Sequence, residues 1–93
     1  MNIQEIVNNP TTTIVDVRMP FEFDEEHVEG AINIPLQEIP QRVEEFKNMK
    51  QPIVVYCRSG SRSGQAQMFL RQHGISEIYN GGGLYDMLDL MRK

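Results

Sequence analysis

The residues with the clearest chemical potential form one short segment around the only cysteine of the chain, Cys57. The segment that follows it combines small and cationic side chains: Arg58, Ser59, Gly60, Ser61, Arg62 and Ser63. Small residues let the backbone curl so that several N–H groups converge on one point, and such a concave turn binds anions. Nearby guanidinium groups and a helix N-terminus favour thiolate over thiol and so lower the pKa of a cysteine. The segment therefore predicts a nucleophilic thiolate beside an anion site.

Two other interpretations of this segment explain less of it. A buried structural cysteine accounts for neither the two arginines nor the Gly-Ser turn. A nucleotide-binding P-loop is excluded because the stretch from Gly60 to Gly64 is too short and lacks the lysine.

The elements that must position the cysteine follow from alternating apolar runs. Short β-branched runs predict strands at residues 13–17, 31–34 and 53–56, with a weaker one at 77–79. The strand at 53–56 leads directly into Cys57, and Ser63 is expected to open the longest helix. Ligands of parallel α/β sheets collect at the carboxyl ends of the strands, which is where this arrangement places the cysteine.

Helical periodicity occupies the segments between the strands. Asn2 and Glu5 have the spacing of a capping box, which predicts a short N-terminal helix. Residues that share one helical face then recur at intervals of three and four in three stretches: Leu36, Ile39, Val43 and Phe46; Ala66, Phe69, Leu70 and His73; and Leu84, Leu88 and Met91. We therefore expect an α/β fold, with a small parallel sheet of four to five strands and helices on both faces, in which residues 1–93 form a single domain.

Composition limits the classes of partner. The 93 residues carry a net charge of −4, which argues against sequence-blind nucleic-acid binding and against binding to anionic membranes. Residues 1–50 hold ten acidic and four basic side chains, whereas residues 51–93 hold three and five, so an anionic ligand is expected to meet the second half. A single cysteine forms no internal disulfide, and an acid stands where a signal peptide has its basic region. We expect a cytoplasmic protein, and the absence of a heptad favours a monomer.

Five motifs in order give the chain a family resemblance. They are Asp16-Val17-Arg18, Glu22, the segment His27 to Ala31 with Asn33-Ile34-Pro35, the loop Cys57 to Ser63, and Gly82-Gly83. On these motifs, which span essentially the whole chain, the sequence resembles the single-domain rhodaneses, a sulfurtransferase family. Two positions depart from the family pattern: Glu26 replaces a glycine before His27, and Met87 replaces a tryptophan that commonly follows the glycine pair.

The resemblance implies a chemistry. Cys57 would be the catalytic residue, taking a sulfane sulfur from thiosulfate or a similar donor as a persulfide and passing it to cyanide or a thiol. The loop residues Arg58, Ser59, Gly60, Ser61, Arg62 and Ser63 would bind the donor. No metal and no organic cofactor is implied.

Three alternatives remain at this point. A persulfide carrier that delivers sulfur to a protein acceptor would use the same loop. A phosphatase of the same fold needs C-x5-R, but here only four residues separate Cys57 from Arg62, and Ser63 stands where the phosphatase arginine would be. A non-catalytic binding module typically loses the cysteine, which this chain keeps.

The remaining motif residues are interpreted as structural support. Asp16 and Arg18 are expected to pair, with Glu22 as a second acceptor for Arg18, which would hold the loop after the first strand. His27 is expected to be a structural hydrogen-bonding group rather than a general base. The acidic side chains of Asp24, Glu25, Glu26 and Glu29 are expected to form a solvated rim.

Overall fold

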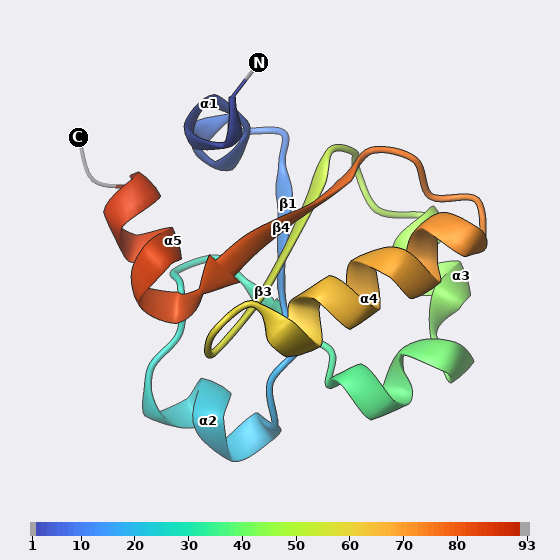
Figure 1. The fold of residues 1–93 in the computed structure, drawn as a ribbon, viewed down its shortest axis with the longest axis horizontal. Helices are drawn as coiled ribbons and strands as arrows, with labels where there is room; N and C mark the ends of the chain where they lie inside the picture. Colours follow the sequence, from blue (N-terminus) through green and yellow to red (C-terminus); the bar gives the residue numbers. More distant parts are fainter. Residues whose placement is uncertain (1, 92–93) are drawn as a thin grey trace.

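Four parallel strands form the sheet that carries Cys57, in a computed structural model that describes residues 2–91 (Figure 1). The strands are β1 (Thr13–Asp16), β2 (Ile32–Asn33), β3 (Ile53–Cys57) and β4 (Ile78–Gly83), in the order β2-β1-β3-β4. All three neighbouring pairs are parallel. Every residue of β3 is buried, because this strand has a neighbour on each side and helices on both faces. The predicted α/β class and small parallel sheet are confirmed.

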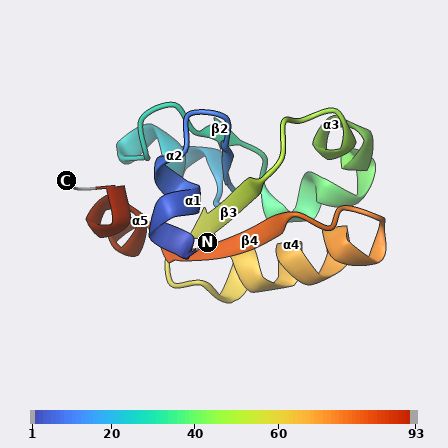
Figure 2. The same cartoon turned by 90° about the horizontal axis from the view of Figure 1, so that it is seen from above.

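Alternate residues of β3 divide the core into two clusters. Val54 and Tyr56 pack with the apolar residues of α1 (Ile3–Asn8) and α5 (Leu84–Met91). Ile53, Val55 and Cys57 face the opposite way, toward Phe46 of α3 (Val43–Lys47) and Leu70 of α4 (Ser61–Gln72). Successive side chains of a strand point to opposite faces, so helices cover both faces, as predicted (Figure 2).

The first helix begins with the predicted capping box. The Glu5 N–H donates to Asn2 Oδ1 at 2.9 Å, and the Asn2 N–H donates to Glu5 Oε1 at 3.0 Å. These two bonds satisfy backbone donors that the first turn of a helix leaves without partners.

The helical stretch expected across residues 36–46 is divided in two. It forms a 3₁₀ helix, η1 (Leu36–Gln41), followed by α3, with Arg42 at φ −121° between them. Pro40 lies inside η1, and a proline provides no N–H and disfavours continuous α-helix. The periodicity therefore identified the apolar face but not the break.

Two further differences concern the site. The longest helix begins at Ser61 rather than Ser63, because Gly60 turns the chain in a left-handed conformation, φ 100°, directly before it. A helix that the apolar pattern did not predict, α2 (Pro20–Glu25), follows β1. None of its residues is buried, and Phe21 and Phe23 are two positions apart, so they do not have helical spacing. The helix begins with Pro20 at its first position. None of the helices described in residues 2–91 is long and apolar enough to cross a membrane.

Candidate active site

Cys57 is the last residue of the central strand β3, and the turn that follows the strand surrounds its thiol. Cys57 is fully buried. Its Sγ accepts a hydrogen bond from the Gly60 N–H at 3.0 Å and lies 3.3 Å from the Ser63 hydroxyl oxygen. The left-handed conformation of Gly60, which a side chain would strain, turns this N–H toward the sulfur. The turn therefore brings donors to the sulfur from the backbone and from one side chain.

These donors set the direction of the thiol pKa. Burial by itself raises the pKa of Cys57, because it penalises the charged form. The Ser63 hydroxyl and the backbone N–H groups of Ser63, Ser59 and Gly60 act in the opposite direction and bring the pKa of Cys57 below its ordinary value. The direction agrees with the sequence prediction, but hydrogen bonds rather than the two arginines are the main lowering cause.

The loop side chains divide into an exposed group and a buried one. Arg58, Ser59 and Ser61 are exposed, and Gly60 and Arg62 are half-buried. Ser63, which was predicted to bind the donor, is fully buried, and its hydroxyl lies against Cys57 and Asn80. The side chain of Ser63 therefore lies against the sulfur from within the protein, because the first turn of α4 directs it toward Asn80 of β4.

Asn80 is a site residue that none of the sequence motifs marked. It lies in β4, and its Nδ2 donates to the Gly60 carbonyl at 3.0 Å. Its Oδ1 accepts from the Ser63 hydroxyl at 2.7 Å and from the Gly82 N–H at 2.9 Å. A signal was present: Asn80 is a polar residue directly after the predicted strand at 77–79, at the sheet edge where sites form.

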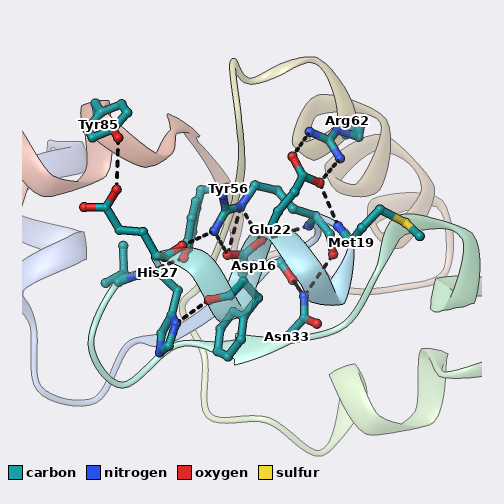
Figure 3. Close-up of polar contacts among 12 residues, drawn as sticks. Asp16, Met19, Glu22, His27, Asn33, Tyr56, Arg62 and Tyr85 are labelled. Carbon is teal, nitrogen blue, oxygen red and sulfur yellow. Dashed lines mark hydrogen bonds and ion pairs between the residues drawn. The ribbon is translucent and has the colours of Figure 1, made fainter.

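Glu22 pairs with Arg62 and not with Arg18. Arg62 Nη1 and Nη2 donate to the two carboxylate oxygens of Glu22 at 2.8 and 3.1 Å (Figure 3). The same carboxylate accepts the Met19 N–H at 2.9 Å and so caps α2. The prediction that Glu22 is a second acceptor for Arg18 is therefore wrong. The Glu22 carboxylate binds Arg62 of α4, and Arg18 Nη2 donates to the Glu26 carbonyl instead.

The pair predicted between Asp16 and Arg18 is present and buried. Arg18 Nη2 lies 2.7 Å from Asp16 Oδ2, with exposed side-chain fractions of 7% and 0%. Arg18 also donates to the Glu26 carbonyl at 2.6 Å, and Asn33 Nδ2 donates to the carbonyls of Asp16 and Arg18 at 3.0 and 2.9 Å. The guanidinium lies over the Tyr56 ring, 5.8 Å from its centroid. This network fixes the segment between β1 and α2 against the sheet (Figure 3).

His27 contacts Phe23, four residues earlier in the chain. Its Nδ1 lies 2.7 Å from the Phe23 carbonyl, and its ring stacks on Phe23 with centroids 3.7 Å apart. These contacts match the predicted structural role. Glu26, one of the two departures from the family pattern, accepts the Tyr85 hydroxyl at 2.9 Å, and Met87, the other, is fully buried in the core.

A cavity of about 350 Å³ lies beside the cysteine loop and meets it at Arg58. Its lining combines cations, acids and exposed aromatic rings: Arg18, Arg58, Glu22, Glu25, Glu26, Phe21 and Tyr85. Among residues 2–91, Arg58 has no ion-pair partner, in contrast to Arg62. Arg58 is thus the loop cation free to meet a ligand in this cavity.

Gly83, the second glycine of the Gly82-Gly83 pair, determines how closely β4 approaches the loop after Cys57. A Cβ at Gly83 would collide with the Arg58 carbonyl, so no side chain fits there without moving the backbone. The close approach of Gly83 therefore sets where the peptide between Arg58 and Ser59 lies.

Sheet and site together define a parallel α/β protein whose single cysteine lies at a strand end and accepts a backbone N–H from the turn that follows. The chain belongs to the rhodanese-like domain family, whose family model matches residues 2–86. It is 45% identical over 74 residues to the thiosulfate sulfurtransferase PspE of Escherichia coli (strain K12), covering 78% of this chain and 71% of that protein. The solved structure of a rhodanese with anions from E. coli is 42% identical, with a TM-score of 0.74, over 81% of this chain and 89% of that one.

A further relative extends the range of roles in the family. The putative sulfur carrier protein YrkF of Bacillus subtilis (strain 168) is 31% identical over 77 residues, which is 83% of this chain and 41% of that protein. The predictions of a rhodanese and of a sulfurtransferase as the enzyme class are confirmed.

Proposed function

We propose that this protein transfers a sulfane sulfur from thiosulfate, or a donor of similar chemistry, to cyanide or a thiol through a persulfide on Cys57. The observation that carries the proposal is the hydrogen bonding of Cys57 Sγ, which receives the Gly60 N–H at 3.0 Å inside an anion-binding turn. The name of the PspE relative supports thiosulfate as the donor. The steps need neither a metal nor an organic cofactor.

In the first half-reaction, the Cys57 thiolate attacks the outer sulfur of thiosulfate. A bond forms between Sγ and that sulfur, the S–S bond of thiosulfate breaks, and sulfite leaves with the bonding electron pair. One negative charge remains on the outer sulfur of the persulfide, so the total charge is unchanged. Arg58, which lines the cavity, would bind the sulfonate oxygens of the donor.

In the second half-reaction, an acceptor attacks the outer sulfur of the persulfide. With cyanide, a C–S bond forms, the S–S bond breaks, and the Cys57 thiolate leaves, which gives thiocyanate and the starting enzyme. The hydrogen bonds from Gly60 and Ser63 that favour the thiolate before the first step also stabilise it as the leaving group here.

The arrangement of Arg62 argues against the phosphatase alternative. In that chemistry the loop arginine must reach into the anion site and hold a phosphoryl group with two parallel hydrogen bonds. Here both terminal nitrogens of Arg62 bind Glu22. The short loop and the occupied arginine together favour a small sulfur anion over a phosphate ester.

The intact mass of the purified protein after treatment with thiosulfate, without reductant, tests the proposal. We expect a gain of one sulfur atom that is absent in Cys57→Ser and is removed by cyanide with release of thiocyanate. No gain with thiosulfate, mercaptopyruvate or a persulfide-loaded protein would overturn it, and hydrolysis of an aryl phosphate would then identify a phosphatase.

A protein acceptor is the second candidate, and the surface around the cavity favours it. Phe21 and Tyr85 are 64% and 67% exposed, and both line the cavity together with Glu25 and Glu26. Exposed rings beside acids suit a cysteine carried on a basic protein segment. We expect Phe21→Ala with Tyr85→Ala to slow sulfur transfer to a cysteine-containing basic peptide but not to cyanide; equal slowing would count against this candidate.

We also propose that residues 1–93 act as one monomeric domain in a reducing compartment, the cytoplasm. The family match over residues 2–86 supports one domain. A reducing compartment keeps the single cysteine, Cys57, available as a nucleophile.

A further inference from the structure

The orientation of the Asn80 amide is determined by two backbone groups. The Gly82 N–H can only donate and lies 2.9 Å from one amide atom, which must therefore be the oxygen. The Gly60 carbonyl can only accept and lies 3.0 Å from the other, which must be the nitrogen. Asn80 consequently presents an acceptor, and not a donor, to Ser63.

The buried Ser63 hydroxyl lies between two possible acceptors. Its oxygen is 2.7 Å from Asn80 Oδ1 and 3.3 Å from Cys57 Sγ. A serine hydroxyl has a single hydrogen, so it donates to one of the two at a time. When Cys57 is a thiol, the hydroxyl donates to Asn80, and the thiol hydrogen can be donated to the Ser63 oxygen.

Ionisation of Cys57 reverses this arrangement. The thiolate has no hydrogen and needs donors, and the Gly60 N–H is already one of them. Rotation of the Ser63 hydroxyl toward Sγ supplies another. Asn80 Oδ1 then still accepts the Gly82 N–H, so the rotation leaves no buried acceptor without a partner.

We propose that Asn80 is a positioning residue that competes with the Cys57 thiolate for the hydrogen of the Ser63 hydroxyl. The inference rests on the proposed function only in that Cys57 reacts as a thiolate. In the persulfide the negative charge lies on the outer sulfur, so the hydroxyl hydrogen returns to Asn80. The hydroxyl thus follows the charge of Cys57 through both half-reactions, and Asn80 limits how far the thiolate is stabilised. Such a limit preserves nucleophilicity, which falls as the pKa of a thiol falls.

A purely structural role for Asn80 predicts a different result. If Asn80 only holds Gly60 in place, its removal loosens the turn, weakens the Gly60 N–H bond to Sγ, and raises the pKa of Cys57 whether or not Ser63 is present. Competition for the hydroxyl predicts the opposite sign, and only while the hydroxyl exists. The two roles are therefore separable with a double-mutant cycle.

The test is the pH dependence of the alkylation rate of Cys57 by iodoacetamide in wild type, Asn80→Ala, Ser63→Ala and the double variant. We expect Asn80→Ala to lower the midpoint of the alkylation pH profile by about half to one pH unit. A shift of this size corresponds to the free energy of one neutral hydrogen bond. In the Ser63→Ala background we expect Asn80→Ala to produce no such fall. Gln67→Ala is the matched control, because it removes another amide donor between α4 and β4, to the Ile78 carbonyl, without contact to Cys57.

An equal shift in both backgrounds, or a rise with Ser63 present, would overturn the proposal. Should Asn80→Ala fail to fold, Asn80→Asp can replace it in the same double-mutant cycle. The new carboxylate accepts the Ser63 hydroxyl more strongly than the amide does. The midpoint of the alkylation pH profile should therefore rise more when Ser63 is present than in the Ser63→Ala background. Equal rises would overturn it. Alkylation involves no sulfur donor, so this result is independent of the mass measurement that tests the transfer of sulfur.

Discussion

Arg62 and Glu22, forty residues apart in the chain, form an ion pair with two hydrogen bonds of 2.8 and 3.1 Å. Arg62 belongs to the first turn of α4, and Glu22 to the first turn of α2. The pair therefore ties the segment after β1 to the segment after Cys57, at the carboxyl end of the sheet (Figure 3). It also occupies both terminal nitrogens of Arg62, one of the two loop arginines.

The Glu22 carboxylate gives the pair a pH dependence. The Arg62 hydrogen bonds lower the pKa of Glu22 from an ordinary 4.5 to about 2 in the folded protein. A lowered folded pKa stabilises the protein fully above the unfolded value, and this contribution is lost as the pH falls toward the folded value.

We therefore expect the unfolding free energy of wild type at pH 7 to exceed that of Glu22→Gln by about 1 kcal/mol, because Arg62 is partly exposed. Wild type should accordingly have the higher melting temperature. The difference should shrink as the pH falls from 4.5 toward 2. Melting curves of both proteins across this range check the prediction; a constant difference would contradict it.

The two loop arginines should differ in their effect on the donor. Arg58 is exposed at the cavity without an ion-pair partner among the described residues, whereas Arg62 is held by Glu22. We expect Arg58→Ala to raise KM for thiosulfate about tenfold with little change in melting temperature, since a hydrogen bond to a charged ligand is lost.

Arg62→Ala should lower the melting temperature and change KM less. Lys50→Ala, an exposed side chain before the start of β3, controls for the loss of one positive charge. A larger KM effect from Arg62→Ala than from Arg58→Ala would show that Arg62 leaves Glu22 to bind the donor.

Gly83→Ala should damage both stability and activity. Its Cβ would collide with the Arg58 carbonyl, so the peptide between Arg58 and Ser59 has to move. We expect a loss of about 2 kcal/mol or more in unfolding free energy, as for overpacking, and a fall in kcat/KM.

Gly74→Ala provides the comparison for the effect of Gly83→Ala. Gly74 has φ 95° and open space around it, so this substitution should cost about 1–2 kcal/mol from backbone strain. It lies away from the site, so kcat/KM of the folded enzyme should not change. The same fall in kcat/KM for both variants would contradict a specific effect of Gly83 on the loop.

Asp16→Asn should destabilise the protein more than any of the substitutions above. It leaves the Arg18 guanidinium, only 7% exposed, without its carboxylate. Breaking a buried ion pair on one side costs about 3–5 kcal/mol. Urea unfolding should show a lower midpoint with an unchanged slope; a loss below about 1 kcal/mol would mean that Arg18 finds another acceptor.

Local features of the chain were predictable from the sequence. The capping box of Asn2 and Glu5 and the strand leading to Cys57 depend on residues within a few positions of one another, so their spacing reports their geometry. The division at Pro40 and Arg42 was not predicted, because the apolar face continues across it and only the backbone changes. The short helix α2 was missed because its phenylalanines, Phe21 and Phe23, do not have helical spacing.

The sequence by itself determined the chemical class of the protein: a lone cysteine at a strand end, followed by a small-residue turn of fixed length. Only the tertiary structure decided which partners the polar groups take. Glu22 binds Arg62 rather than Arg18, and Ser63 faces Asn80 rather than solvent. A long or buried side chain binds the partner that lies nearest in space. The packing of the elements around the sheet sets those distances, and residue spacing along the chain does not predict them.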